Sequence, residues 1–356
     1  MYFKDSHNTG QEKFHKKFTV LTHRIHTQFY YCYPEALIKG ICLLFLLTLA
    51  YGCSESVDYV EETQLDITSP YFTSSVRFNA VNALDILVFN DDRLQRLDSY
   101  QKIKGFTGDM VHATSTGGQK IFFLYYGPSK ERYEWADINS YGALRKVICN
   151  LEEEDRDNPV MTGHCRLDAG LVQGSVTLTP LASEVWLNSL RFDFSGTPYA
   201  GRPVSETKAY LINVNASCSI TADSGSGGMR MINTGMLNPD DMNGFADRSI
   251  LMHTFGEDFH TQTAHPEKSF LCYPNGGDTG MLTKLVIEGK IDGITYYWPI
   301  SVGKEGGIAR SSSYRYDILI RRKGVSDPDS LIEPEIIEID LSIKPWNEKE
   351  NYPVRF

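Results

Sequence analysis

The chain has 356 residues, of which 41% are hydrophobic and 22% are charged, and its formal net charge is -10. This length exceeds one ordinary domain, and the apolar content is enough for packed cores, which excludes a largely disordered protein. The acidic balance, without a basic stripe, argues against nucleic acid as a partner and against electrostatic attachment to anionic lipids. Attachment to a membrane would therefore need a covalent anchor.

The N-terminal segment has the pattern of a secretory signal peptide. Residues 41–50 form an apolar run with the length of a signal-peptide core, too short to cross a bilayer, which takes ~20 residues. The small residues Ala50 and Gly52 precede Cys53, a spacing similar to that of a bacterial lipobox. We expect cleavage after Gly52, lipidation of Cys53, and removal of residues 1–52. An ordinary signal peptide with an incidental cysteine, or a short buried helix, is the alternative.

An acidic tether and a first strand are expected over residues 53–70. The residues directly after Cys53 are polar and acidic, as in a segment that holds a folded body away from a membrane, although a solvated leader has the same composition. Residues 64–69 alternate between apolar and polar side chains and predict a short strand.

The next part of the chain predicts a β domain over residues 71–168. Alternating apolar patterns that end at Asp, Gly or Pro predict strands, and one stretch with apolar residues at helical spacing predicts a short helix. The expected strands are 82–90, 94–104 and 119–126, and the expected helix is 140–149.

The rest of the chain, residues 169–356, predicts a second β domain. Asp292-Gly293 joins two alternating runs and indicates a tight hairpin. Many short strands with hardly any strand–helix–strand rhythm predict an all-β fold of two sandwiches. The expected strands are 175–178, 184–194, 207–214, 269–273, 283–291, 293–299, 313–321 and 335–344.

Four cysteines remain if the signal is removed and Cys53 is acylated: Cys149, Cys165, Cys218 and Cys272. Their wide spacing, without a Cys-x-x-Cys pair, does not indicate a zinc site. Two disulfides are arithmetically possible in three connectivities, and buried free thiols or a single pair fit the sequence as well.

The sequence offers little for catalysis. His253, His260 and His265 fall in one polar stretch, but their spacing matches no helical metal-binding motif. We expect them to be surface residues that bind no metal. His164 and Cys165 are adjacent in sequence, and neighbouring side chains on a strand would point to opposite faces. We therefore expect no metal, no cofactor and no enzymatic activity.

An ordered set of segments carries a family resemblance that covers most of the chain after Cys53. Together these segments resemble fimbrillin-type fimbrial subunits of the Bacteroidales, and are most similar to the lipoprotein anchors of fimbriae. The segments are 84–92, 97–100, 178–185, 192–194, 198–201, 210–215, 314–318, 327–329 and 341–346. The resemblance implies two tandem transthyretin-like β-sandwich domains after a lipoprotein signal peptide, and assembly by β-strand exchange.

Strand exchange in that family implies roles for particular residues here. In polymerising subunits, a protease specific for arginine removes the first strand, and Arg77 is the possible cleavage site. A neighbour's terminal strand then fills the vacated groove, since an open edge offers unpaired N–H and C=O groups. The donor-type strand would present Ile337, Ile339, Leu341 and Ile343 on one face, although an ordinary terminal strand has the same alternation.

The expected function is that of a structural subunit of a surface fimbria, with other fimbrial subunits and outer-membrane lipid as partners. No Lys or Arg occurs between Cys53 and Arg77, which favours an anchor that keeps its lipid and first strand. Cleavage after Arg77 would instead give a stalk or tip subunit carrying adhesion. A surface glycan-binding lipoprotein is the alternative of another class. It would need exposed aromatic platforms. The tryptophans Trp135, Trp186, Trp298 and Trp346 are scattered along the chain, and the strand patterns around Trp186 and Trp298 predict burial.

Overall fold

The computed structural model describes residues 60–68, 82–106, 108–128, 135–221, 230–276, 281–303, 307–332 and 336–346. The expected sites of signal cleavage, lipidation and proteolysis, Gly52, Cys53 and Arg77, lie outside these ranges. Within them, no helix is both long and apolar enough to span a membrane.

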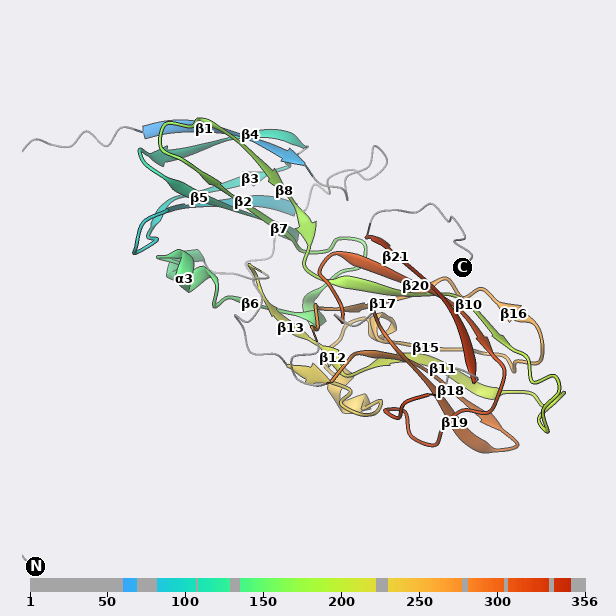
Figure 1. Ribbon diagram of the computed structural model, residues 1–356. Helices are drawn as coiled ribbons and strands as arrows, with labels where there is room; N and C mark the ends of the chain where they lie inside the picture. The colour runs from blue at the N-terminus through green and yellow to red at the C-terminus, as the bar shows by residue number, and fades with distance from the viewer. Residues whose placement is uncertain are drawn as a thin grey trace, which may run out of the picture. The chain divides into compact units, whose positions relative to one another are not determined.

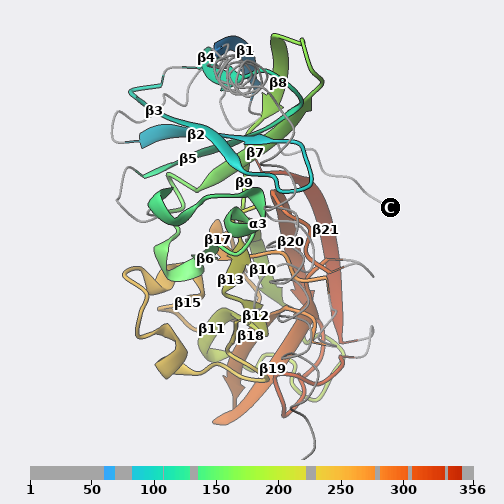
Figure 2. The same ribbon diagram turned by 90° about the vertical axis from the view of Figure 1, so that its left-hand side faces the viewer.

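The first sandwich consists of a three-stranded and a five-stranded sheet, which face each other as two layers in Figures 1 and 2. The three-stranded sheet has the order β4-β1-β8, with β1 at Val60–Thr68, β4 at Asp109–Thr116 and β8 at Gln173–Thr177. The other has the order β3-β2-β5-β7-β9: β2 (Asn82–Asn90), β3 (Leu97–Lys104), β5 (Lys120–Pro128), β7 (Met161–Leu167) and β9 (Thr179–Pro180).

The core of the first sandwich follows from strand alternation. Leu84, Ile86 and Val88 of β2 point to the three-stranded sheet and meet Leu65 and Ile67 of β1. Leu87 and Phe89, on the other face of β2, belong to a separate and larger apolar cluster. The internal strand β2 is therefore buried on both faces, which explains its nearly continuous apolar sequence.

The second sandwich also has two sheets. One has the order β16-β10-β20-β21 with β17 also on β10: β10 (Ser183–Phe192), β16 (Thr263–Ala264), β17 (Lys268–Cys272), β20 (Ser312–Ile320) and β21 (Ile337–Pro345). The other has the order β15-β11-β18-β19: β11 (Ser205–Ile212), β15 (Met252–Thr254), β18 (Lys284–Ile291) and β19 (Ile294–Ser301). The hairpin predicted at Asp292-Gly293 is confirmed: it joins β18 to β19, with φ of 52° and 81° at the two turn residues.

Short elements occupy the chain around the junction. The prediction of a helix over residues 140–149 is wrong in length, because α3 covers only Tyr141–Leu144, after Ser140 as its N-cap. Residues 148–150 form β6 (Ile148–Asn150), which pairs with β13 (Ser217–Ser219). The remaining elements are η2 (Trp135–Asp137), η3 (Leu151–Glu153), β12 (Val214–Asn215), β14 (Met231–Ile232), η4 (Pro239–Met242) and η5 (Arg248–Ile250).

Strand pairing places residues 173–180 in the first sandwich. β8 pairs with β1, and β9 pairs with β7. The expected boundary between residues 168 and 169 therefore falls inside the first sandwich, in the turn between β7 and β8. Since β10 begins at Ser183, the chain passes from one sandwich to the other within a few residues after Pro180.

Candidate strand-exchange site

The strand β1 is the middle strand of its three-stranded sheet, between β4 and β8. It pairs antiparallel with β4 and parallel with β8, so its backbone is hydrogen-bonded along both edges. Thr63, Leu65 and Ile67 alternate along it and are buried, whereas Asp66 and Thr68 are exposed. Without β1, β4 and β8 would border an apolar groove with two unpaired strand edges.

The groove is fitted closely to the side chain of Leu65. In register, Leu65 lies opposite Val111 of β4 on one side and Gly174 of β8 on the other. A Cβ atom at Gly174 would lie 3.2 Å from Cδ2 of Leu65 and 3.0 Å from a methyl group of Leu167. Glycine at this position is therefore what lets the leucine reach the core.

A buried ion pair in the five-stranded sheet is hydrogen-bonded to β4 of the three-stranded sheet. Lys120 Nζ of β5 lies 3.2 Å from Oδ2 of Asp98 in β3, with side chains 3% and 7% exposed. The hydroxyl and the N–H of Thr116 in β4 donate to the same carboxylate, at 2.6 and 2.7 Å. Burial raises the pKa of Asp98, but the hydrogen bonds from Thr116 and Lys120, with the charge of Lys120, outweigh it and hold the pKa below 3.8.

The two sandwiches repeat one arrangement of strands. In the second, β10 takes the place of β1: it pairs antiparallel with β17 and β16, and parallel with β20. By this correspondence β8 matches β20. The difference is β21, which adds to the free edge of β20, whereas within the described ranges no strand adds to the corresponding edge of β8. β21 thus has no counterpart among the described strands of the first sandwich.

The apolar face of β21 is only partly covered. Ile337, Ile339, Leu341 and Ile343 lie opposite core-facing residues of β20, yet Ile339 is 38% and Ile343 44% exposed. In the opposite sheet of the sandwich β19 is the last strand, and β21 is the edge strand of its own sheet (Figure 1). The alternation predicted for these four residues is thus present as one face, and half of that face lacks a cover.

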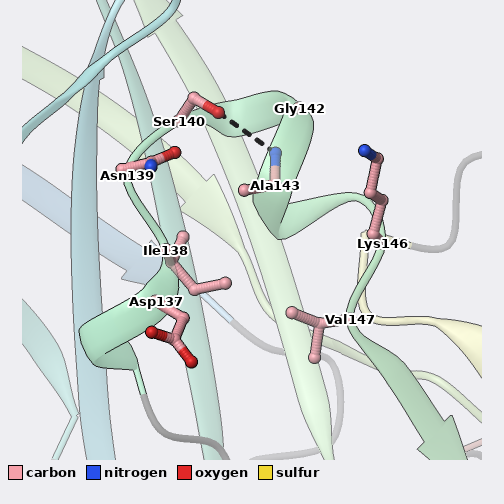
Figure 3. A pocket seen from close by; sticks show the side chains of 8 residues that line it. All are labelled: Asp137, Ile138, Asn139, Ser140, Gly142, Ala143, Lys146 and Val147. Atoms are coloured by element: carbon pink, nitrogen blue, oxygen red, sulfur yellow. Dashed lines mark hydrogen bonds between the residues drawn. The ribbon is translucent and has the colours of Figure 1, made fainter.

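The one pocket described, of about 550 Å³, lies around η2 and α3 in the first sandwich. Figure 3 shows the side chains of Asp137 and Lys146 on different sides of it, and Ser140 Oγ accepting a hydrogen bond from Ala143 N at 3.2 Å. Ser140 therefore caps the helix through its hydroxyl.

The histidines and tryptophans singled out in the sequence do not converge. Within the described ranges no three His, Cys, Asp or Glu side chains are grouped as metal ligands would be. His253 packs its ring against Phe255, at 4.8 Å between centroids. Of the four tryptophans, Trp298 and Trp346 are buried, Trp135 packs edge-on against Tyr125, and the guanidinium of Arg315 covers Trp186 at 4.9 Å.

Sequence reasoning missed several residues that form the groove. β4 and β7 are rich in Thr, Ser, His and Gly, and a strand pattern was not recognised there, although Val111 and Ala113 of β4 face the core. The alternation of Met110, Val111, His112 and Ala113 was the one available signal, and only two of these residues are apolar and buried. Gly174 carried no signal, because its role depends on Leu65 across the sheet.

Comparisons with known proteins agree with this architecture. No family model and no curated protein sequence matches the chain. Among solved structures, a candidate cell adhesion protein from Bacteroides eggerthii is 15% identical with a TM-score of 0.58, over 80% of this chain and 96% of that one. A fimbrilin from Porphyromonas gingivalis is 12% identical with a TM-score of 0.57, over 80% and 97% of the two chains.

A candidate cell adhesion protein from Parabacteroides distasonis is similar as well, at 13% identity and a TM-score of 0.54, over 83% and 99% of the chains. At such identities the similarity concerns the fold, and it extends over nearly the whole length of each neighbour. The described chain is an all-β protein with one short α-helix, and it shares its fold with fimbrilin and candidate cell adhesion proteins of the Bacteroidales.

Proposed function

We propose that this protein is a structural subunit of a cell-surface fimbria, joined to a neighbouring subunit by β-strand exchange. The observation that carries the proposal is the position of β1, which fills an apolar groove between β4 and β8 and is hydrogen-bonded on both sides. A strand in this position can be replaced by another of the same alternation, because main-chain pairing gives affinity and alternate side chains fill the core.

Within this proposal, β21 is the strand that the protein donates. Its apolar face is half uncovered, and the plan that the two sandwiches share does not include it. The partner would be another fimbrial subunit with an open groove. Ile337, Ile339, Leu341 and Ile343 would enter that groove as Leu65 and Ile67 enter the groove of this chain.

We place the protein at the outer membrane as the anchor of the fimbria, attached through acylated Cys53. An anchor retains its first strand, so its own groove stays filled; it can donate a strand but cannot accept one, which ends assembly. The absence of Lys and Arg between Cys53 and Arg77 supports this role, since an arginine-specific protease has no earlier site.

The test is intact-mass and N-terminal analysis of the protein from native outer membranes, with a Cys53→Ala variant as the control. An acylated Cys53 on a chain that continues through Arg77 is the expected result, and the variant should be lost from the membrane fraction. A mature chain that begins at Phe78 without lipid would overturn the anchor assignment and indicate a cleaved stalk or tip subunit.

A further inference from the structure

The strands β6 and β13 form a two-stranded sheet that joins the two halves of the chain. β6 precedes β7 of the first sandwich in sequence, and β13 follows β11 of the second. Cys149 of β6 lies directly opposite Cys218 of β13. Of the four described cysteines, these are the two that face each other in register, because Cys165 lies opposite Phe122 and Cys272 opposite Ser183.

The backbone brings the two cysteines to a distance that suits a covalent bond. Leu151 N donates to Ala216 O and Ile220 N donates to Val147 O, both at 2.9 Å. Cys149 and Cys218 lie between these two pairs, two residues from each. Since hydrogen-bonded pairs alternate along an antiparallel ladder, they too form a hydrogen-bonded pair, for which the Cα separation is typically ~5.5 Å. Disulfides occur at Cα separations of about 4.4–6.8 Å, and directly opposed side chains project from the same face.

The surroundings hold the pair in place. Glu154 accepts from Tyr273 Oη at 2.8 Å and from Val160 N at 3.1 Å. Arg310 donates to the carbonyl oxygens of Thr162 and Thr179. The charges of Glu154 and Arg310 influence the Cys218 thiol electrostatically, and both side chains are held by these hydrogen bonds. The segment that carries Cys218 is itself held by Tyr273 N, which donates to Asn215 O at 3.1 Å, and by Thr162 Oγ1, which donates to Ile220 O at 3.2 Å.

We propose that Cys149 and Cys218 are an oxidisable pair that closes to a disulfide and joins the two sandwiches covalently. The oxidant is an external disulfide, such as oxidised glutathione or the active-site disulfide of a thiol oxidase. Neither cysteine is bonded to another sulfur here, so both are available for the exchange. Disulfides persist outside the cytosol, where the proposed function places the protein, but the chemistry of the pair does not depend on that placement.

The reaction is two successive thiol–disulfide exchanges. Cys218, which is half-buried, loses its proton and attacks one sulfur of the external disulfide, forming a mixed disulfide and releasing one thiolate. The buried Cys149 then loses its proton, attacks the Cys218 sulfur and releases the second thiolate. Two electrons pass to the external disulfide, which leaves as two thiols after taking up the two protons.

The exchange should accelerate as the pH rises. The hydrogen bond with Cys149 and then burial raise the pKa of the Cys218 thiol, the negative charges of Cys149 and Glu154 raise it further, and Arg310 opposes them. The attacking thiolate is therefore scarce at neutral pH. Slow closure at neutral pH and faster closure at alkaline pH are the expected pattern.

The experiment treats the full mature chain with oxidised glutathione at alkaline pH, then counts free thiols after denaturation and maps peptides by mass spectrometry. We expect the loss of two thiols, a cross-linked peptide pair containing Cys149 and Cys218, and a melting temperature higher by about 5–10 °C that dithiothreitol reverses. Cys165→Ser is the matched control and should behave as the wild-type chain does, apart from the thiol it lacks.

Two further variants keep the outcome decisive. Cys149→Ser should stop at a stable glutathione adduct on Cys218, and Cys218→Ser should give neither the cross-link nor the thermal shift. The proposal is overturned if the folded wild-type chain retains a glutathione adduct on Cys218 without closing, or if its two thiols stay unreacted while the denatured chain is oxidised. Neither result bears on the strand-exchange proposal, which is tested by the mature N-terminus.

Discussion

At the scale of single residues, the first sandwich depends on a few side chains that neighbouring strands enclose. Leu65 is fully buried and lies opposite Gly174, where an added Cβ atom would lie 3.2 Å from its Cδ2. Asp98 and Lys120 are buried as a pair and hydrogen-bonded to Thr116, so that three strands meet in one polar contact. The polar contact joins the two sheets, because Asp98 and Lys120 belong to the five-stranded sheet and Thr116 belongs to β4 of the three-stranded sheet.

Truncating the core side chain of β1 should loosen the whole sandwich. Leu65→Ala removes a buried side chain and leaves a cavity that strands held by hydrogen bonds on both sides cannot close. We expect the free energy of unfolding in urea to fall by about 3 kcal/mol. Asp66→Ala, at the exposed neighbouring position of the same strand, should change it by less than about 0.5 kcal/mol. Equal effects of the two variants would contradict the burial pattern of β1.

The ion pair between Asp98 and Lys120 should make the free energy of unfolding decrease in acid. Because the folded-state pKa of Asp98 is lowered, its contribution is complete above pH 3.8 and is lost as the pH falls through the folded value. Asp98→Asn should cost about 3 kcal/mol at neutral pH, since it leaves Lys120 buried without a counter-charge. This difference from the wild-type chain should shrink in urea titrations below about pH 3.8. A difference that stays constant down to pH 2 would refute the assignment.

At the scale of secondary-structure elements, the first and last described strands differ in what they contribute. β1 is internal, paired on both edges and buried on alternate residues. β21 is an edge strand, paired on one side, with half of its apolar face in solvent. An internal strand is part of the fold itself, whereas an edge strand of this kind is held to its sheet along one side only.

Deletion of each strand should therefore have a different outcome. Deleting residues 60–68 should leave the first sandwich unable to fold, because the groove between β4 and β8 stays open. Ending the chain after Ile332 should leave both sandwiches folded, with a modest loss of thermal stability from the exposed edge of β20. Circular dichroism and thermal melting distinguish the two. Collapse of the second sandwich on removal of β21 would count against its role as a donor strand.

At the scale of the whole described chain, one apolar cluster runs through the junction. It includes Leu87 and Phe89 of β2, Leu144 of α3, Cys149 of β6 and the core residues of β10 and β11. Arg310, from the turn before β20, donates to the backbone oxygens of Thr162, Thr179 and Pro180. The two sandwiches therefore share packing and hydrogen bonds, and we expect them to unfold together.

Replacing Arg310 should make the two sandwiches unfold separately. Arg310→Met leaves three backbone oxygens of the first sandwich without this donor, at a cost of about 1–3 kcal/mol for each oxygen that stays buried. Differential scanning calorimetry should then show two transitions in place of one. Arg321→Met, which removes an exposed pair with Glu338, should keep a single transition. Two transitions already in the wild-type chain would contradict a shared core.

The strands with strong apolar alternation could be located from the sequence, and those with weak alternation could not. β2, β5 and the hairpin of β18 and β19 are close to their predicted ranges. β4 and β7 were missed, because few of their residues are large and apolar. Residues 145–149 were predicted as helix from the spacing of Val147 and Ile148. Pairing of β6 with β13 overrides that local preference.

The fold class and the presence of two β domains could be predicted from local patterns, since alternation and turn residues are local properties. The alternating face of β21 and the acidic character of the chain could be predicted in the same way. Three further features follow from the tertiary structure alone: β1 is internal, residues 173–180 complete the first sandwich, and Cys149 faces Cys218. These depend on which distant strands hydrogen-bond to each other, and strand register across many intervening residues leaves no periodic trace in the sequence.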